Sequence, residues 1–364
     1  MTVKVSDIVA RIDDAFPFER AEEWDAVGLL VGDPHAAVSG VIVTLDPTDA
    51  ALERAREAGA NVLVTHHPAF LTPPARLTPA VAPVAFAAAR DGIALIAAHT
   101  NLDRDPGAAD TLSHLLGIHP GRPVEETLLP VALVTVYVPV ESESGVAAAM
   151  QAAGAGRIGE YRGCSFATEG TGRFTPSEDS SPAIGDRAEP SLAPEVRLEM
   201  VAAPALAGRV VRAARESHPY EEPLISVAET AIARGRARMG RLCTLDAPMS
   251  LGDLAVRAAR TFGVTPRVWG DPQRVVSSMV TGTGSAGSLI GPARAAGADV
   301  LLGGEVRYHD ALTAVESGLA VIEIGHDVSE WPLVGILAEA VLATDGLKPA
   351  SVIVECPSAA WWTP

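Results

Sequence analysis

Short apolar runs alternate with longer alanine-rich or amphipathic segments along most of the chain. In residues 40–60, GVIVTLDPTDAALERAREAGA, a β-rich apolar run is followed by a turn at Asp46-Pro47 and a helical segment. The same order of strand, turn and helix is predicted for residues 92–117, and it returns in three segments after residue 270. This alternation predicts an α/β fold with largely parallel sheets. The continuous apolar runs are typical of strands that are covered on both faces.

The middle of the chain has a different pattern. Residues 132–154 predict one strand and one helix, whereas residues 159–203 are rich in Gly, Pro, Ser and acidic residues between two alternating strands. This density of turn residues predicts long loops or a hairpin, and we expect a surface loop at residues 175–197. A following helix is predicted to break at His218-Pro219.

These patterns predict how the chain is divided. A chain of 364 residues is long for a single hydrophobic core, which favours two or three units. We predict an α/β core formed by residues 1–125 and 236–364, into which a separate α+β domain of residues 126–235 is inserted.

Charge and cysteine content narrow the classes of partner and compartment. The chain has 28 basic and 45 acidic side chains, and its net charge of −17 repels phosphate backbones, so nucleic acid is not expected as a partner. No apolar run reaches the roughly 18 residues that a membrane span needs, and the first residues do not resemble a secretory signal. The three cysteines, Cys164, Cys243 and Cys356, are odd in number and far apart, which argues against a disulfide framework and predicts a cytoplasmic location.

Residues that can bind metal ions follow four of the predicted strands. They are His66 and His67 after NVLVT, His99 and Asp103 after IALIAA, Glu305 and His309 after DVLLGG, and His326 and Glu330 after AVIEIG. Because sites in open parallel sheets form outside the carboxyl ends of the strands, these four distant segments can converge in one crevice. A single histidine at a strand end more often belongs to a surface or a core, so it is the joint pattern that indicates a site.

The spacing of these residues adds geometric detail. His326 and Glu330 are four residues apart, as are Glu305 and His309, and each pair shares a face if its helix has begun. Adjacent strand residues point to opposite faces, so two neighbouring histidines can reach one site only where the strand has ended; the proline that follows them favours such an end. Mixed imidazole and carboxylate ligands favour Zn, Mn, Fe or Co, and their number suggests two ions bridged by a carboxylate.

A glycine-rich segment allows several interpretations. Residues 282–287, GTGSAG, match GxGxxG after a predicted strand, and Glu305 follows near the end of the next strand, which is the outline of a dinucleotide fingerprint. The same glycines are also typical of a tight turn needed for close packing, or of a loop that approaches a phosphate. We favour the tight turn, because a nicotinamide site would leave the other three strand ends unexplained.

Several stretches, in order, resemble the NIF-three-like family of dinuclear metal proteins, whose members carry the name GTP cyclohydrolase type 2 homologue. These stretches are WDAVGLLVGD (24–33), VTHHPAF (64–70), AAHTNLD (97–103), GGEVRYHDA (303–311) and GHDVSE (325–330). GAGRIGEYRGCSF (154–166), GTGRFTP (170–176) and HPYEEP (218–223) resemble the CutA-like, ferredoxin-like insert of the longer bacterial members. One departure is Ala26, where many members have Asn.

The resemblance implies a two-lobed α/β core with two divalent ions per subunit, Zn, Fe, Mn or Co, and a ring-like homohexamer. The family's metal ligands fall on His66, His67, Asp103, His326 and Glu330. His99 would be a nearby polar residue or an additional ligand, and Glu305 and His309 would flank the site. Any of these three residues could act as a general acid or base.

Two functions remain open from the sequence. Two divalent ions can activate water and polarise a substrate, so hydrolysis of a nucleotide or another phosphoester is one expectation. The chain lacks a GxxxxGK[ST] motif and an arginine cluster for a triphosphate. The alternative is a non-catalytic protein that binds or delivers metal, or that serves as a scaffold.

Two smaller features have simple interpretations. His218 and Glu221 of HPYEEP could bind a metal, but a turn fixed by two prolines is the interpretation we favour. Trp361 and Trp362 are expected to pack on a neighbouring surface.

Overall fold

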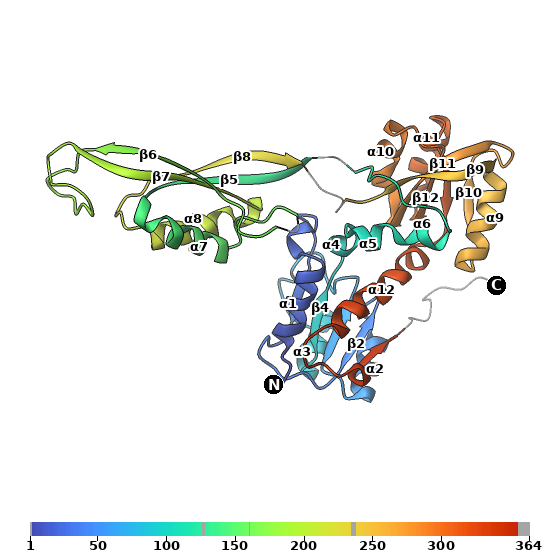
Figure 1. The fold of residues 1–364 in the computed structure, drawn as a ribbon. Coiled ribbons are helices and arrows are strands. Elements are labelled where there is room, and N and C mark those ends of the chain that lie inside the picture. The colour runs from blue at the N-terminus through green and yellow to red at the C-terminus, as the bar shows by residue number, and fades with distance from the viewer. Residues whose placement is uncertain (1, 126–127, 160, 234–237, 356–364) are drawn as a thin grey trace. The chain divides into compact units, whose positions relative to one another are not determined.

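The computed structural model describes residues 2–125, 128–159, 161–233 and 238–355 (Figure 1). Cys356, Trp361 and Trp362 lie outside the described residues. The chain forms two compact units, Met1–Glu125 together with Arg236–Pro364, and Glu126–Gly235. None of the helices in the described ranges combines the length and the apolar composition that a membrane span requires.

The first unit contains two five-stranded sheets. The first sheet has the order β1-β4-β3-β2-β14. Its strands are β1 (Gly28–Val31), β2 (Val41–Thr44), β3 (Val62–Thr65), β4 (Ala94–Ala97) and β14 (Val352–Val354). Every residue of β2, β3 and β4 is buried, which confirms that these continuous apolar runs are strands covered on both faces.

Helices cover both faces of this first sheet. They are α1 (Val5–Ala15) and α12 (His326–Leu342) on one face, and α2 (Asp49–Ala58) and α3 (Pro83–Asp91) on the other. Leu333 and Leu337 of α12 pack with Ile8 of α1 in one core. Helix α12 is apolar on nearly all sides, as expected of a helix buried between several elements. Its first turn is therefore held in place, which matters for the site described below.

The second sheet has the order β10-β13-β12-β11-β9. Its strands are β9 (Arg241–Ser250), β10 (Arg267–Trp269), β11 (Val275–Ser285), β12 (Val300–Glu305) and β13 (Ala320–Glu323). The helices α6 (Thr111–Leu115) and α9 (Leu251–Phe262) contribute to the core on one face, and α10 (Ile290–Ala295) and α11 (Tyr308–Glu316) to that on the other.

Both sheets contain antiparallel pairings, although three of the four strand pairings in the first sheet and two of the four in the second are parallel. β1 runs antiparallel to β4 in the first sheet, and β9 and β10 run antiparallel to their neighbours in the second. The central strands are parallel, as expected of strands joined by crossover helices. The difference is confined to the edges, because an edge strand has a single neighbour and its direction is not set by the central crossovers.

The segment after β4 also differs from the expectation. A single helix was predicted there, but the structure has three short ones, α4 (Thr100–Asp103), α5 (Pro106–Ala109) and α6. Pro106 has no N–H to continue a helix, and the Asp105 side chain accepts a hydrogen bond from the Gly107 N–H (2.9 Å) to begin a new one. Asp103 consequently lies at the end of α4.

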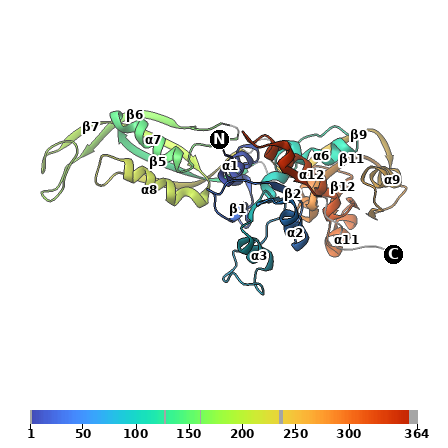
Figure 2. The same ribbon diagram turned by 90° about the horizontal axis from the view of Figure 1, so that it is seen from below.

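The second unit is a four-stranded antiparallel sheet with two helices on one face. Its elements are β5 (Leu128–Pro139), α7 (Glu143–Ala152), β6 (Phe166–Phe174), β7 (Ser191–Ala202), α8 (Ala207–Ser217) and β8 (Ile225–Ala233). The strand order β6-β7-β5-β8 and the βαββαβ succession are those of a ferredoxin-like unit. Helices α7 and α8 lie side by side and share a core with the sheet (Figure 2).

Two details of this unit bear on the predictions. The loop expected at 175–197 ends earlier, because β7 begins at Ser191 and alternates between buried and exposed residues. Helix α8 ends at Ser217, immediately before His218-Pro219, as predicted from the proline. The His218 Nε2 donates to the Tyr137 carbonyl (2.9 Å), and its Nδ1 accepts from the Tyr220 N–H (3.0 Å). Both ring nitrogens therefore stabilise the turn.

Short 3-10 turns complete the described structure. They are Phe18–Arg20, Val140–Ser142, Pro204–Leu206, Ala286–Leu289 and Pro349–Ser351.

Candidate metal centre

The two adjacent histidines lie immediately beyond β3, where the chain bends. The His66 N–H donates to the Thr44 carbonyl (3.2 Å) and the His67 N–H to the Leu45 carbonyl (2.9 Å), so the backbone stays against β2. Because regular pleating has ended, both imidazoles turn to the same site, with ring centroids 5.1 Å apart. This is the geometry expected from a strand that ends at a His-His-Pro sequence.

The first turn of α12 supplies two further donors. Helix α12 begins at His326, and Glu330 lies one turn later on the same face, with His326 Nε2 3.2 Å from Glu330 Oε2. The Glu330 carboxylate is 3% exposed. The helix starts at the end of β13 and packs on the first sheet, so it carries donors of the second sheet to those of the first.

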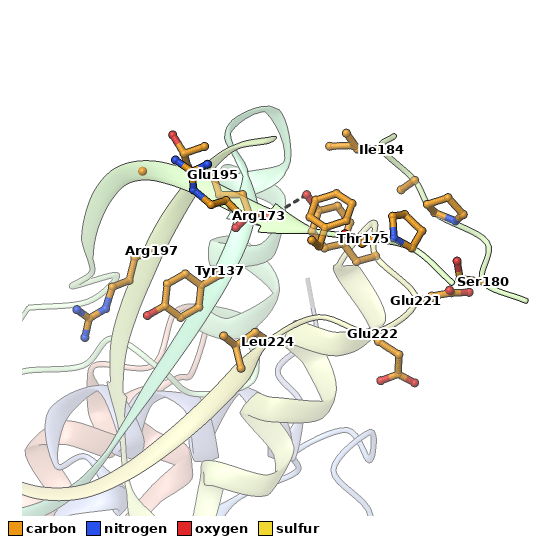
Figure 3. A pocket seen from close by; sticks show the side chains of 18 of the residues that line it. Tyr137, Arg173, Thr175, Ser180, Ile184, Glu195, Arg197, Glu221, Glu222 and Leu224 are labelled. Atoms are coloured by element: carbon orange, nitrogen blue, oxygen red, sulfur yellow. Dashed lines mark hydrogen bonds between the residues drawn. The ribbon is translucent and has the colours of Figure 1, made fainter. Parts of the chain in front are cut away.

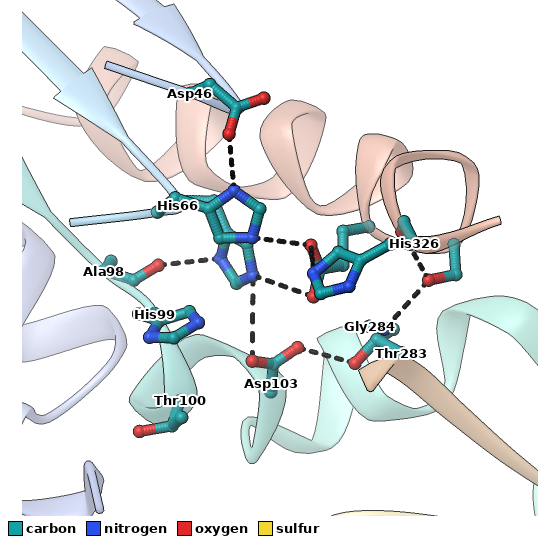
Figure 4. Close-up of polar contacts among 12 residues, drawn as sticks. Asp46, His66, Ala98, His99, Thr100, Asp103, Thr283, Gly284 and His326 are labelled. Atoms are coloured by element: carbon teal, nitrogen blue, oxygen red, sulfur yellow. Dashed lines mark hydrogen bonds and ion pairs between the residues drawn. The ribbon is translucent and has the colours of Figure 1, made fainter. Parts of the chain in front are cut away.

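The structure brings donor atoms from these segments together in three groups, each with atoms within 4.8 Å of one another. The groups are His66, Asp103 and Glu330; His67, His326 and Glu330; and His66, His67 and His99. Figure 4 shows His66, His99, Asp103 and His326 around one small volume. The first two groups share Glu330 alone, which places this carboxylate between them.

One buried ligand atom in this cluster, the Nε2 atom of His66, has no hydrogen-bond partner among the described residues. The Oε2 atom of Glu330, by contrast, lies 2.8 Å from the Nε2 of His67 and 3.2 Å from that of His326. The His66 Nδ1 donates to the Ala98 carbonyl (2.9 Å), so its Nε2 lone pair faces the cluster. This Nε2 is 3.7 Å from the nearest oxygen of Asp103 and 3.7 Å from that of Glu330. Donors on a tetrahedral ion with bonds near 2.05 Å lie about 3.3 Å apart, so these gaps fit an ion better than direct hydrogen bonds.

Every histidine of the cluster has its other ring nitrogen held by an oxygen. His67 Nδ1 is 2.7 Å from Asp46, His99 Nδ1 is 2.8 Å from Asp25, and His326 Nδ1 is 3.1 Å from Glu305. The Asp103 carboxylate accepts a hydrogen bond from the Thr283 hydroxyl (2.5 Å). Outer oxygens that fix the tautomer and the orientation of an imidazole are typical of histidines that bind metal.

The two buried carboxylates of the cluster favour positive charge close to them. Burial raises the pKa of the Asp103 carboxyl above its ordinary value; His66 opposes this effect and the charge of Glu330 adds to it. Burial alone would also raise the pKa of Glu330, but the surrounding imidazoles, His66 foremost, hold it well below its ordinary value. The two carboxylates therefore need cations close to them in order to remain ionised together.

The imidazoles respond in the opposite sense. Burial alone would lower the pKa of His67, yet its contacts with Asp46 and Glu330 raise it to about 10. The contact with Glu330 likewise raises the pKa of His326 to about 9, against the effect of burial. In the ion-free state protons on these rings neutralise the carboxylates, and a metal ion would displace them.

The glycine-rich segment 282–287 packs against this centre. β11 continues to Ser285 and is followed by the 3-10 turn at Ala286–Leu289. Gly284 has a φ of 55°, and a Cβ there would collide with the Glu330 carboxylate. The Gly284 N–H donates to the Ser329 hydroxyl (2.8 Å). These contacts support the close-packing interpretation, because the glycine allows α12 to approach β11.

The other predicted site residues fall in different places. Glu305 is the last residue of β12 and α11 begins at Tyr308, so Glu305 and His309 do not share a helix face. The extended residues between them break the expected four-residue spacing. Glu305 nevertheless contacts His326 (3.1 Å). His309 is exposed, its ring contacts Tyr308, and it belongs to none of the donor groups found among the described residues.

Three residues that support the centre were missing from the predicted set. Asp46 follows β2 at the same sheet edge as the histidines, so the strand-end argument could have found it. Asp25 and Thr283 lie in the stretches WDAVGLLVGD and GTGSAG, which were noted for other reasons. Asp25 also accepts hydrogen bonds from the N–H (3.0 Å) and hydroxyl (2.6 Å) of Thr100. Although burial alone would raise its pKa, the bonds from His99 and Thr100 lower it.

Comparisons with known proteins agree on one family. The family model described as Duf34/NIF3 (NGG1p interacting factor 3) matches residues 3–354. A Mycobacterium leprae protein named GTP cyclohydrolase 1 type 2 homolog is 34% identical over 350 residues, which cover 93% of this chain and 90% of the relative. A Bacillus subtilis protein of the same name is 33% identical over 331 residues, which cover 89% and 88%.

The chain belongs to the Duf34/NIF3 family. This confirms the family indicated by the sequence stretches around the histidines.

Solved structures extend the likeness to the fold. A Bacillus cereus protein related to NIF3 superposes with a TM-score of 0.68 at 28% identity, and the match covers 98% of this chain and 97% of that one. A Staphylococcus aureus protein matches with a TM-score of 0.70 at 24% identity over 100% and 99%, which shows a shared fold. The mixed α/β architecture with several sheets is thus that of a Duf34/NIF3 protein.

Proposed function

We propose that this Duf34/NIF3 protein binds two divalent metal ions at the cluster. His66 and Asp103 would hold one ion, His67 and His326 the other, and Glu330 would bridge them. The observation that carries this proposal is the pair of donor groups that share only Glu330, together with the buried Nε2 atom of His66, which has no hydrogen-bond partner among the described residues.

The donor set indicates the class of metal. Imidazole and carboxylate ligands without thiolates favour Zn, Mn, Fe or Co over Ca or Mg, which prefer oxygen donors. His99 is the additional donor near His66 and His67, and it can complete the coordination of one ion or remain free for chemistry.

The reaction that fits such a centre best is hydrolysis. Two divalent ions supply Lewis acidity and lower the pKa of water, so that a nucleophile forms near neutral pH. Asp25 holds the Nδ1–H of His99, which leaves the Nε2 of that ring to accept or release a proton toward the cluster. Glu305 is 56% exposed beside His326 and can exchange protons with solvent.

The names of the relatives suggest the substrate class. Proteins at 34% and 33% identity are named GTP cyclohydrolase 1 type 2 homolog, so a nucleotide or another phosphoester is the substrate we propose. The alternative function, reversible metal binding or delivery, is favoured by the accessibility of His326, whose side chain is 35% exposed and offers a route for exchange.

The family resemblance also leads us to propose an assembly. We infer a homohexamer in which residues 126–235 act as an inserted CutA-like domain, and the ferredoxin-like strand order of that unit supports the second part. Sedimentation equilibrium of the full chain tests the hexamer, and a monomeric mass would exclude it.

The metal content of the protein tests the centre. Protein prepared without chelators or nickel affinity resin should carry two ions per chain, as measured by plasma mass spectrometry. Glu330→Gln should remove both, because it alone belongs to both groups, and His66→Ala should remove one. Glu339→Gln is the matched control, an exposed glutamate on the same helix that should leave both ions bound. Absence of bound metal, with no uptake of Zn, Mn, Fe or Co, would refute the proposal.

Turnover assays then distinguish a hydrolase from a carrier. Metal-loaded protein should hydrolyse a nucleotide or a phosphoester, and Asp25→Asn should lower kcat by about 10- to 100-fold while two ions remain bound. A carrier would bind the ions and transfer them to a chelator without turning over any such substrate.

A further inference from the structure

The second unit contains a cavity of about 700 Å³ that lies apart in sequence from every candidate metal ligand. It is lined by the far end of β6 and β7, by the loop that joins them, and by the turn after α8 (Figure 3). Its volume is within the range of small-molecule sites. The lining includes the stretch GTGRFTP and three residues of HPYEEP, Tyr220, Glu221 and Glu222, which the proposed metal chemistry does not use.

Aromatic side chains and bare backbone form the walls. Tyr137, Phe174 and Tyr220 line the cavity, and the rings of Phe174 and Tyr220 lie 6.0 Å apart at an angle of 58°. Gly172 has no side chain to separate β6 from Glu195, and a Cβ there would collide with the Glu195 carboxylate. The glycine therefore lets this carboxylate lie against the strand, beside the rings.

Most of the lining charge is negative once paired groups are set aside. Arg197 pairs with Glu199 (2.5 Å), and Glu222 pairs with Arg215 (2.8 Å). The remaining charged side chains that line the cavity are Glu169, Glu195, Glu221 and Arg173. Three carboxylates thus outnumber one guanidinium, so the cavity favours a cation.

Glu195 is the carboxylate best placed to receive such a ligand. One of its oxygens accepts a hydrogen bond from the Tyr220 hydroxyl (2.9 Å). Burial, and then Glu195 itself, raises the pKa of Tyr220 above its ordinary value, so the hydroxyl stays neutral and remains a donor. Glu195 has a second oxygen with which to accept a hydrogen bond from an ammonium group.

We propose that this cavity binds an organic cation, namely an amine carried on an aromatic or apolar body. The ammonium group would bond to Glu195, and the body would pack on Tyr137, Phe174 and Tyr220, whose ring faces also attract positive charge. An anion of the same shape would meet three carboxylates and would be rejected.

Two probes of matched shape test the proposal on the full-length protein. Tyramine carries an ammonium group on a phenol, and 4-hydroxyphenylacetate carries a carboxylate on the same ring. Tyramine should bind saturably with a millimolar dissociation constant, a value in keeping with its size, as measured by ligand-observed NMR. Glu195→Gln should weaken tyramine binding about tenfold, which corresponds to about 1.4 kcal/mol for one charge-assisted hydrogen bond.

Two further variants separate the site from its surroundings. Glu178→Gln changes an exposed glutamate of the same loop outside the lining and should leave tyramine binding unchanged. Tyr137→Leu should weaken it about two- to fivefold through the lost ring face. Hydrogen exchange of β6 and β7 would reveal whether Glu195→Gln alters the fold. If it does, Tyr137→Leu still tests the site.

Three results would overturn the proposal. They are equal or tighter binding of 4-hydroxyphenylacetate, no saturable binding of tyramine up to roughly 10 mM, and binding that neither Glu195→Gln nor Tyr137→Leu weakens. If a second copy of the chain filled the cavity, tyramine would show no saturable binding. Metal content should be the same in all of these variants, so the outcome is independent of the proposed metal centre.

Discussion

The candidate metal centre and the cavity of the second unit are built from similar side chains but differ in burial. At the centre Glu330 is 3% exposed, and the buried Nε2 atom of His66 has no hydrogen-bond partner among the described residues. In the cavity Arg197 is 53% exposed and is paired with Glu199. A charge out of contact with water must be neutralised by a close partner, whereas an exposed pair contributes little. We therefore expect tight, selective ion binding at the centre and weak, class-selective ligand binding in the cavity.

The largest effect on this comparison is expected from a substitution that disturbs the packing around the metal centre. Gly284→Ala would place a side chain in the left-handed region and against Glu330, and should destabilise the protein by about 2–4 kcal/mol. Gly335→Ala is the matched control in α12, where a Cβ meets no atom within 4 Å, and it should stabilise by about 0.5–1 kcal/mol. Urea unfolding followed by tryptophan fluorescence measures both, because residues 126–235 contain no tryptophan. Equal effects of the two substitutions would contradict the proposed close approach.

Substitutions of two nearby threonines of β11 are expected to have effects of intermediate size. Thr283→Val removes the hydroxyl that holds Asp103 and should reduce metal affinity about 10- to 100-fold. Thr281→Val should leave metal affinity unchanged and should be neutral or stabilising by up to about 1 kcal/mol, because the buried Thr281 hydroxyl has no partner among the described residues. Competition with a fluorescent chelator measures the affinities. If Thr281→Val lowered metal affinity as much as Thr283→Val, the loss could not be assigned to the hydrogen bond between Thr283 and Asp103.

The smallest expected effect is a dependence of the second unit's stability on pH. Burial lowers the pKa of His218 below its ordinary value, and the neutral ring accepts a hydrogen bond from the Tyr220 N–H. The folded state thus binds fewer protons than the unfolded state, so this stabilisation is present above the unfolded pKa near 6.5 and is lost as the pH falls below it.

His218→Gln keeps a donor for the Tyr137 carbonyl but does not titrate. Hydrogen exchange of residues 207–224 should therefore accelerate more in the unmodified protein than in the variant between pH 7 and pH 5, once intrinsic exchange rates are removed. Identical changes in the two proteins would rule out His218 as the titrating group.

Local sequence rules accounted for much of the site. The strand before His66 and His67 ends where the proline requires, and the four-residue spacing of His326 and Glu330 became a shared helix face because α12 begins at His326. The same rule failed for Glu305 and His309, since the helix there begins at Tyr308. Two residues four apart share a helix face only if both lie within the helix, so the first helical residue must also be known.

The outer partners of the histidines could not be found by such rules. Asp25 and His99 are 74 residues apart, and Asp103 and Thr283 are 180 apart. No periodicity links residues at these separations, because their contact depends on how two sheets pack around α12. The antiparallel edges of the sheets escaped prediction for a related reason, as an edge strand can join in either direction without changing the buried pattern of its neighbours.

The sequence by itself determined the alternation of strands and helices in the core, the family, and the residues able to bind metal, because apolar periodicity and turn chemistry act over a few residues. The tertiary structure alone decided which donors form two groups around Glu330, why Gly284 must be a glycine, and where a cavity opens beside Glu195. These features depend on distances between atoms far apart in the chain, and burial, which decides the strength of each interaction, exists only once the sheets and helices have packed.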